Sequence, residues 1–207
     1  MRTYIYIDGF NFYYGCVKGT EYKWLDFKKL FSKVLNARHQ IISIKYFTAL
    51  VSPTSDDPGK QIRQRSYLRA LEAYIPEIEI YYGHFLRNTV RMPLDQPSQT
   101  ARFVNVVKTE EKGSDVNLAI HLLNDAWRNA YDCAVVVSND SDLAEALRLV
   151  REQNHKFIGV INPGHLHPSV QLKKHADFVR PIRKSALSNS LLPDPIPGTS
   201  IHKPKGW

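Results

Sequence analysis

Four aspartates stand at points in the sequence where carboxylates could act together. Asp8 directly follows a short apolar segment, and Asp140 and Asp142 follow the most apolar segment of the chain. Asp115 begins a helical pattern shortly before that segment. Neighbouring carboxylates repel one another and raise one another's pKa unless a cation neutralises them. Because Mg²⁺ and Mn²⁺ take hard oxygen ligands, we expect the four aspartates to hold one of these ions and to activate water against a phosphate ester.

Each aspartate also has an ordinary structural explanation. Asp8 and the glycine after it could form a turn at the end of a strand. Asp142 could cap a helix together with Glu145, and Asp115 could suit the dipole of a helix that Ser114 caps. These explanations weaken when taken together, because the positions fall at the same predicted edge of a sheet.

The elements that would position the aspartates alternate between strand and helix patterns. Strands are predicted at 4–7, 41–50, 78–82, 134–137, 157–161 and 178–179, and helices at 26–35, 60–74, 115–130, 143–153 and 170–175. This alternation predicts a three-layer α/β/α fold with a central, mainly parallel sheet. The carboxyl ends of parallel strands meet at one edge, where ligands collect.

Parts of the chain carry a less regular pattern. In 87–112, Pro93 and Pro97 indicate an irregular loop, with an extra strand at 104–107. In the helix at 60–74, Ile62, Leu68 and Leu71 are predicted to face inward. Apolar residues also fall on one side of the helix at 115–130, namely Val116, Ala119, Ile120, Leu123 and Trp127.

Composition divides the chain into a folded domain and a tail. We assign 1–184 to the domain and 185–207 to a tail rich in Pro, Gly and Ser, either extended or docked by Leu191, Leu192 and Trp207. The two cysteines form no Cys-x-x-Cys pair, which argues against a disulfide framework and a cysteine zinc site. No apolar run reaches the length of a membrane span and no signal peptide is visible, so we expect a soluble, cytoplasmic protein without a membrane partner.

The net charge of +8, from 28 Lys and Arg against 20 Asp and Glu, favours a polyanionic partner such as RNA. A soluble basic protein without a special partner is the alternative, and a homodimer or a protein partner is left open. Lys112, Arg63, Arg65 and Arg69 are candidates to bind the RNA backbone, or are solvated surface cations. Asn11 could orient a metal-bound water or a phosphate, or cap a helix.

Three short motifs occur in order along the chain. They are Tyr6-Ile7-Asp8-Gly9-Phe10-Asn11-Phe12, Lys112-Gly113-Ser114-Asp115-Val116 and Val137-Ser138-Asn139-Asp140-Ser141-Asp142-Leu143. Together they resemble the NYN domain family, a branch of the PIN-like nucleases that includes LabA-like proteins. The resemblance spans about Tyr4 to Pro181. It implies a compact PIN-like fold, binding of Mg²⁺ or Mn²⁺, and endonucleolytic cleavage of RNA.

Carried over by position, the resemblance implies that Asp8, Asp115, Asp140 and Asp142 form the catalytic, metal-binding set. Asn11 supports this set, and Ser138 at the head of the last motif is expected to contact substrate. Two residues depart from the family pattern. Asn117 stands where many relatives carry another acid, which could weaken a second metal position, and Asn139 stands where glycine is common.

Three other functions compete with the ribonuclease. An RNA-binding or scaffold protein would keep the fold without cleaving, and metal-independent RNA binding would favour it. A haloacid-dehalogenase-like phosphatase needs a second aspartate shortly after the first, which the segment following Asp8 does not supply. A dinucleotide-binding enzyme is disfavoured because no Gly-x-Gly-x-x-Gly follows the first strand.

Overall fold

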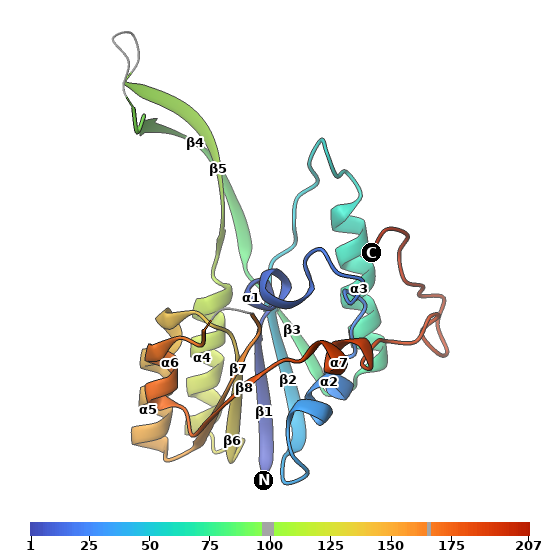
Figure 1. The fold of residues 1–207 in the computed structure, drawn as a ribbon, viewed down its shortest axis with the longest axis vertical. Coiled ribbons are helices and arrows are strands. Elements are labelled where there is room, and N and C mark those ends of the chain that lie inside the picture. The colour runs from blue at the N-terminus through green and yellow to red at the C-terminus, as the bar shows by residue number, and fades with distance from the viewer. Residues whose placement is uncertain (97–101, 165–166) are drawn as a thin grey trace.

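A six-stranded sheet, entirely parallel, forms the centre of the molecule in a computed structural model that describes residues 1–96, 102–164 and 167–207 (Figure 1). The strand order is β3-β2-β1-β6-β7-β8. This confirms the predicted α/β class with a central parallel sheet. The strands are β1 (Arg2–Asp8), β2 (Gln40–Thr48), β3 (Ile78–Tyr82), β6 (Cys133–Val137), β7 (Phe157–Asn162) and β8 (Phe178–Pro181).

Helices cover both faces of the sheet and give two apolar cores (Figure 1). Alternate residues of each strand point to opposite faces, so Ile5 and Ile7 join one core and Tyr6 joins the other. One face carries α2 (Phe27–Val34), α3 (Lys60–Tyr74) and α7 (Lys184–Ser188), and the other carries α4 (Ser114–Trp127), α5 (Ala144–Asn154) and α6 (Val170–His175). Shorter turns are α1 (Gly9–Phe12), η1 (Tyr13–Val17) and η2 (Ser141–Leu143).

Only part of the apolar side identified from sequence on α4 packs on the sheet, where Ala119 and Leu123 lie partly buried against the core. Val116, Ile120 and Trp127 are 61%, 57% and 65% exposed. The helix instead buries a stripe that contains polar residues, namely Ser114, Leu118, Leu122, Asp125 and Ala126. On α3 the prediction was likewise wrong for Ile62, which is exposed, and right for Leu68 and Leu71.

A buried ion pair explains why the inner stripe of α4 contains an acid. Lys45 of β2 and Asp125 of α4 lie 2.7 Å apart, and both are almost completely buried. The Tyr6 hydroxyl also donates to Asp125 at 2.7 Å. Burial and the neighbouring Tyr131 and Asp125 raise the pKa of Tyr6 far above its ordinary value, so its hydroxyl stays protonated and the network stays hydrogen-bonded.

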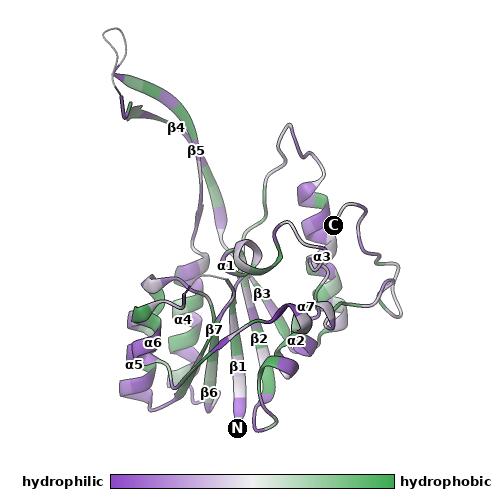
Figure 2. Ribbon diagram, viewed as in Figure 1, coloured by the Kyte–Doolittle hydropathy of each residue, from purple (hydrophilic) through white to green (hydrophobic). Residues whose placement is uncertain are grey.

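The irregular loop predicted for 87–112 is wrong and the strand predicted at 104–107 is right, because most of this segment forms a long antiparallel hairpin. Its strands are β4 (His84–Pro93) and β5 (Phe103–Lys112), which pair with each other and form a separate sheet. Pro97, which supported the loop, lies outside the described residues. Apolar and polar residues are mixed along both strands (Figure 2), so the sequence lacks the alternation that marks a strand with one buried side.

The segment after residue 184 docks on the core of α2 and α3. Leu192 and Ile196 are buried, and the Trp24 indole donates to the carbonyl of Pro193 at 3.1 Å. Trp207 lies with its ring 5.6 Å from that of Tyr67. Of the two alternatives considered for the tail, extended or docked, the structure therefore shows the docked one.

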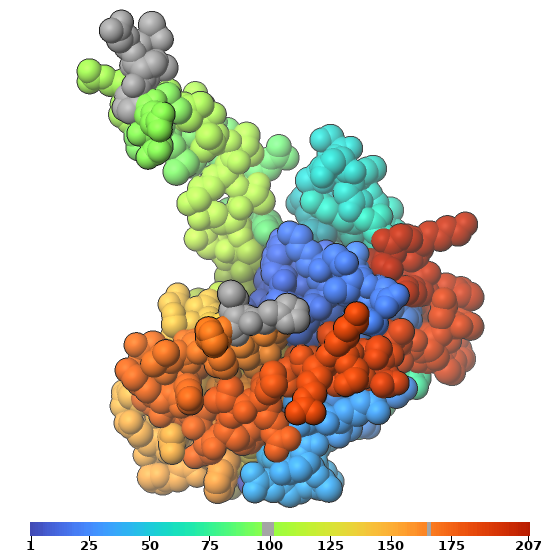
Figure 3. Space-filling model, viewed as in Figure 1, coloured from blue at the N-terminus to red at the C-terminus, as the bar shows by residue number. Residues whose placement is uncertain are grey.

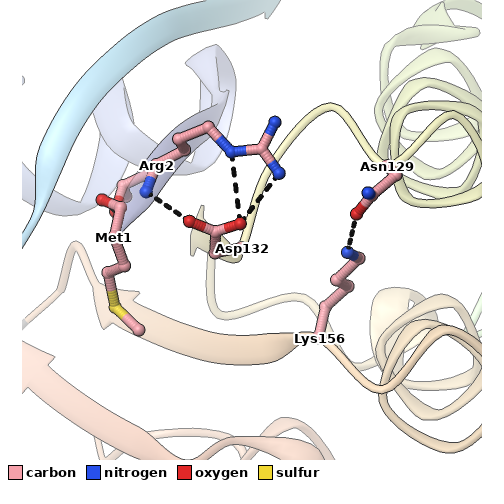
Figure 4. A network of polar contacts seen from close by, with 6 residues as sticks. Met1, Arg2, Asn129, Asp132 and Lys156 are labelled. Carbon is pink, nitrogen blue, oxygen red and sulfur yellow. Dashed lines mark hydrogen bonds and ion pairs between the residues drawn. The ribbon is translucent and has the colours of Figure 1, made fainter.

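Polar contacts fix the start of the central strands at the edge opposite the aspartates (Figure 4). Arg2 pairs with Asp132 at 2.8 Å, and its backbone amide donates to the same carboxylate at 2.7 Å. Lys156 donates to Asn129 nearby. These contacts join the beginnings of β1, β6 and β7. Within the described segments, no helix has the length and apolar character needed to cross a membrane.

Candidate active site

The sheet reverses its strand order between β1 and β6, and the aspartates follow these two strands. Asp8 is the last residue of β1, and Asp140 comes soon after the end of β6. In an open parallel sheet, ligands bind at the carboxyl ends of the strands where the order reverses. The two strands run side by side, with Ile7 opposite Val137, so their carboxyl ends bring the two aspartates to the same edge.

Asp8 is buried, with 4% of its surface exposed, and is held by two hydrogen bonds. One carboxylate oxygen accepts from the backbone amide of Asn11 at 2.9 Å, and the other accepts from the Ser138 hydroxyl at 2.9 Å. The turn that follows requires glycine, because a Cβ at Gly9 would lie 2.6 Å from the carbonyl oxygen of Phe47. Asp8 is the N-cap of the short helix α1, and this capping contact, not the predicted turn, fixes its carboxylate at the edge of the sheet.

A chain of polar contacts links the loops after β1 and β6. The side-chain oxygen of Asn11 accepts from the backbone amide of Asn139 at 3.0 Å. The Ser138 hydroxyl, besides donating to Asp8, accepts from the amide of Asp140 at 3.0 Å. Because Ser138 is fully buried, the substrate contact expected for it is not what the structure has: its hydroxyl positions two aspartates. Asn11 likewise joins two loops and does not cap a helix.

The third aspartate comes from the start of α4. Gly113, with φ of +96°, is the N-cap residue, so the prediction that Ser114 caps this helix is wrong. Asp115 lies in the first turn. Glu111 accepts from the Ser114 amide at 3.1 Å and from its hydroxyl at 2.7 Å. The sequence reasoning missed Glu111 as a site residue, although its place just before the Gly113 turn is a usable signal.

These side chains surround a pocket of about 330 Å³. Asp142 is exposed and lies outside its lining, where its backbone amide donates to Asp140 at 3.0 Å. Asp140 therefore caps η2, the role that had been considered for Asp142. The residues that line the pocket are Asp8, Phe10, Asn11, Tyr14, Phe85, Glu111, Ser114, Asp115 and Asp140.

The four predicted RNA-binding cations are not part of the lining of this pocket. Lys112 follows Glu111 in β5 and lies 3.6 Å from Glu110. Arg63 on α3 pairs with Asp57 at 2.5 Å. Arg65 and Arg69 are exposed on the same helix. If these side chains bind RNA, they would contact nucleotides that lie outside the acidic pocket.

Burial and repulsion make the acidic pocket unfavourable for charged carboxylates. Burial, with smaller contributions from Asp115 and Asp140, raises the pKa of Asp8 to about 6. Burial raises the pKa of Asp115 as well, followed by the charges of Asp140, Glu111 and Asp142. Because the charged carboxylates repel one another, a divalent cation at this edge would offset the repulsion.

The donor chemistry fits a hard cation, and the geometry limits how it is held. Among the described residues, no group of three or more His, Cys, Asp or Glu side chains is arranged to hold a metal ion. Mg²⁺ commonly uses only one or two carboxylates together with water and substrate phosphate. At most two of Asp8, Asp115 and Asp140 could then contact one Mg²⁺ or Mn²⁺ ion directly, and water or substrate phosphate would supply its other ligands.

The raised pKa of Asp8 predicts how the stability of the metal-free protein depends on pH. The folded protein keeps a proton that the unfolded chain releases near its ordinary pKa of 3.8. Its contribution is therefore fully present below about pH 4 and is lost as the pH rises through about 6. In EDTA, we expect the free energy of unfolding to fall by about 3 kcal/mol over this range because of Asp8.

Urea denaturation at a series of pH values would measure this dependence, with Asp8→Asn as the matched variant. The variant should show a flatter profile between pH 4 and 7, because its side chain does not titrate. Equal slopes in the two proteins would contradict the assignment.

A second pocket, also of about 330 Å³, lies beside the acidic one. Phe10 and Tyr14 line both pockets. Eight of the twenty residues that line the second pocket are aromatic, and Lys23, Lys60, Arg63 and Asp57 contribute charged groups, with Arg63 paired to Asp57. Its composition suits a small planar molecule that carries a negative charge.

Comparison with known proteins identifies the family. Residues 2–182 match the NYN domain. The chain belongs to the NYN domain family. This confirms the resemblance inferred from the three motifs, and with it the nuclease-like fold. The acidic pocket described above lies wholly within the matched residues of this NYN domain.

Two similar proteins add different information. The chain is 36% identical over 237 aligned residues to 6-hydroxy-3-succinoylpyridine 3-monooxygenase HspA of Pseudomonas putida, with 100% of this chain and 75% of that protein covered. A crystal structure of a protein of unknown function from Vibrio parahaemolyticus superposes with a TM-score of 0.55 at 19% identity, over 92% of this chain and 96% of that one. The second likeness shows the fold alone.

Proposed function

We propose that this NYN domain is an endoribonuclease that hydrolyses RNA phosphodiester bonds at the acidic pocket with Mg²⁺ or Mn²⁺. The observation that carries the proposal is the convergence of Asp8, Asp115 and Asp140 on one pocket at the point where the strand order reverses. The net charge of +8 over the whole chain suits a polyanionic substrate. RNA is the expected partner, while a cytoplasmic location and any homodimer remain predictions.

In the proposed reaction, water adds to phosphorus and one ester P–O bond breaks. Asp8, Asp115 and Asp140 would hold the cation, directly or through water. When bound, the cation lowers the pKa of water and stabilises the charge on the phosphate oxygens. Ser138 and Asn11 keep the carboxylates in place through the contacts between the two loops. Asp142, at the rim, is the candidate to orient the attacking water.

The direct test is cleavage of labelled RNA by purified protein with Mg²⁺, with Mn²⁺ and with EDTA. Asp140→Asn protein purified in parallel controls for contaminating ribonucleases. We expect cleavage with either metal, at least about 100-fold less in EDTA, and the same loss in the variant. RNA binding without cleavage under all conditions would instead favour a non-catalytic RNA-binding protein with the same fold.

A second candidate function is oxygenation of a small aromatic acid. The specific observations are the printed activity of the 36% identical relative and the aromatic, cation-lined second pocket. Such a reaction inserts one atom of O₂ into the substrate and reduces the other to water with two electrons from a donor. Incubation with 6-hydroxy-3-succinoylpyridine, O₂ and a reduced nicotinamide, with and without added flavin, would test it. Substrate-dependent formation of the hydroxylated product would support this candidate.

A further inference from the structure

The β4–β5 hairpin stands away from the body of the molecule (Figures 1 and 3). Its base lies at the acidic pocket, because residues of both strands line that pocket. Its strands pair from His84 opposite Lys112 to Pro93 opposite Phe103. Two-stranded ribbons are marginally stable in water, so a long one needs a function to explain it. At its base, Phe85 and Glu111 lie opposite each other, and both line the pocket. The Phe85 ring also contacts that of Phe10, with 5.7 Å between centroids.

Directly opposite residues of an antiparallel pair share one side of the ribbon, and successive residues alternate. The register therefore separates two faces that differ in chemistry. The face that begins at the pocket, here called the basic face, carries Phe85, Arg87, Thr89, Arg91, Pro93, Phe103, Asn105, Val107, Thr109 and Glu111. The other, here called the apolar face, carries Val90, Met92, Val104 and Val106 toward the tip, with His84, Leu86, Asn88, Lys108, Glu110 and Lys112 toward the base.

The basic face has the groups that a single nucleic-acid strand needs. Arg87 and Arg91 are exposed, and Glu111 at the pocket is the only acid on this face within the two strands. The apolar face carries the same formal charge, from Lys108 and Lys112 against Glu110, but both of those lysines pair with Glu110, at 2.6 Å and 3.6 Å. The Arg91 guanidinium lies over the ring of Phe103, 4.6 Å from its centroid, and that ring is 50% exposed. Arginines pair with phosphates, while exposed aromatic rings stack with bases.

The dimensions suit several nucleotides leading away from the site of cleavage. Arg87 and Arg91 are four residues apart in a strand, or about 13 Å, and the face extends about 26 Å from Phe85 to Pro93. Ribbons of this kind twist, so the face turns gradually around the hairpin along this length. A flexible single strand can follow such a surface.

We propose that the basic face of the β4–β5 hairpin binds the RNA strand on one side of the scissile phosphate, through Arg87, Arg91 and the ring of Phe103. The inference rests on the proposed function, because Phe85 and Glu111 join this face to the acidic pocket. RNA long enough to reach from the pocket along the hairpin binds more tightly than a short oligonucleotide. A second copy of the chain on the apolar face is the competing use of the hairpin.

The test measures binding without cleavage, in EDTA and in the Asp140→Asn background, by fluorescence anisotropy with labelled single-stranded RNA of about 20 nucleotides. For Arg87→Gln/Arg91→Gln, we expect about 10-fold or greater loss of affinity. The slope of log affinity against log salt should fall by about 1.4, or 0.7 for each lost phosphate contact. Lys108→Gln on the apolar face is the matched control for each single arginine variant, since it removes one charge from the same hairpin.

Equal losses in Arg87→Gln, Arg91→Gln and Lys108→Gln would overturn the proposal, because net charge alone would explain them. Unchanged RNA affinity in the double variant would also overturn it. So would sedimentation that shows a concentration-dependent dimer in the wild-type protein and none in the double variant, with RNA affinity unchanged. The nuclease proposal can fail separately. Arginine-dependent binding by a wild-type protein that does not cleave refutes only the nuclease, and cleavage with arginine-independent binding refutes only the hairpin assignment.

Discussion

Asp8→Asn and Asp140→Asn should each reduce the single-turnover rate of RNA cleavage by at least about 100-fold while leaving the fold intact. Both changes remove one negative charge from the wall of the acidic pocket without a change in volume. The asparagine oxygen at position 8 can still accept from the Asn11 amide, and its NH₂ group can donate to the Ser138 hydroxyl, which is itself able to accept. Loss of activity would then report on charge and not on unfolding.

Two further variants show whether the effect belongs to the pocket. Glu145→Gln removes a charge from exposed α5, where Glu145 pairs with Arg148, and should leave cleavage within about twofold. Asp142→Asn should cost less than either pocket variant, because Asp142 lies at the rim, outside the pocket lining, and would orient water without being part of the acidic wall. Circular dichroism and urea midpoints would check the fold of each protein. Retention of full activity by both Asp8→Asn and Asp140→Asn would exclude the proposed catalytic centre.

The position of this centre could be predicted because it depends on a rule of parallel sheets. The sequence alone shows apolar segments that end at Asp8 and shortly before Asp140. Because parallel strands end at the same edge of the sheet, these two ends are expected to lie together. The contacts that refine the site could not be found in this way. Ser138 is buried beneath Asp8, and Glu111 enters the pocket because it bonds Ser114 across the Gly113 turn. Both depend on distances between loops that sequence spacing does not contain.

The errors in the fold have two physical causes. The hairpin was missed because both of its faces meet solvent, so no apolar alternation marks its strands. On α4, the search for an apolar stripe favoured Ile120 and Trp127, whereas the buried stripe contains Asp125. An acid is acceptable there only because Lys45 meets it from β2, which is 80 residues away in sequence. Periodicity therefore identified the helix correctly but not its inner side.

The same ion pair supports a prediction of large effect on stability. Asp125→Ala should lower the free energy of unfolding by about 3–5 kcal/mol, because it leaves the Lys45 ammonium buried without its partner. Nearby rings compensate only in part, since the Lys45 nitrogen lies 5.9 Å and 5.7 Å from the ring centroids of Tyr4 and Tyr81. Tyr6→Phe, which removes one hydrogen bond to Asp125 and leaves the ion pair, should cost about 1 kcal/mol.

Urea denaturation followed by circular dichroism would measure both losses, with an unchanged m-value as the check on two-state unfolding. The double variant Lys45→Met/Asp125→Leu separates the cost of an unpaired charge from the value of the pair. It should recover most of the stability that Asp125→Ala loses, since apolar groups of similar size can replace a buried ion pair at little cost. If Asp125→Ala costs less than about 1 kcal/mol, water must reach the Lys45 ammonium. The ion pair would then not explain why α4 turns Asp125 toward the sheet.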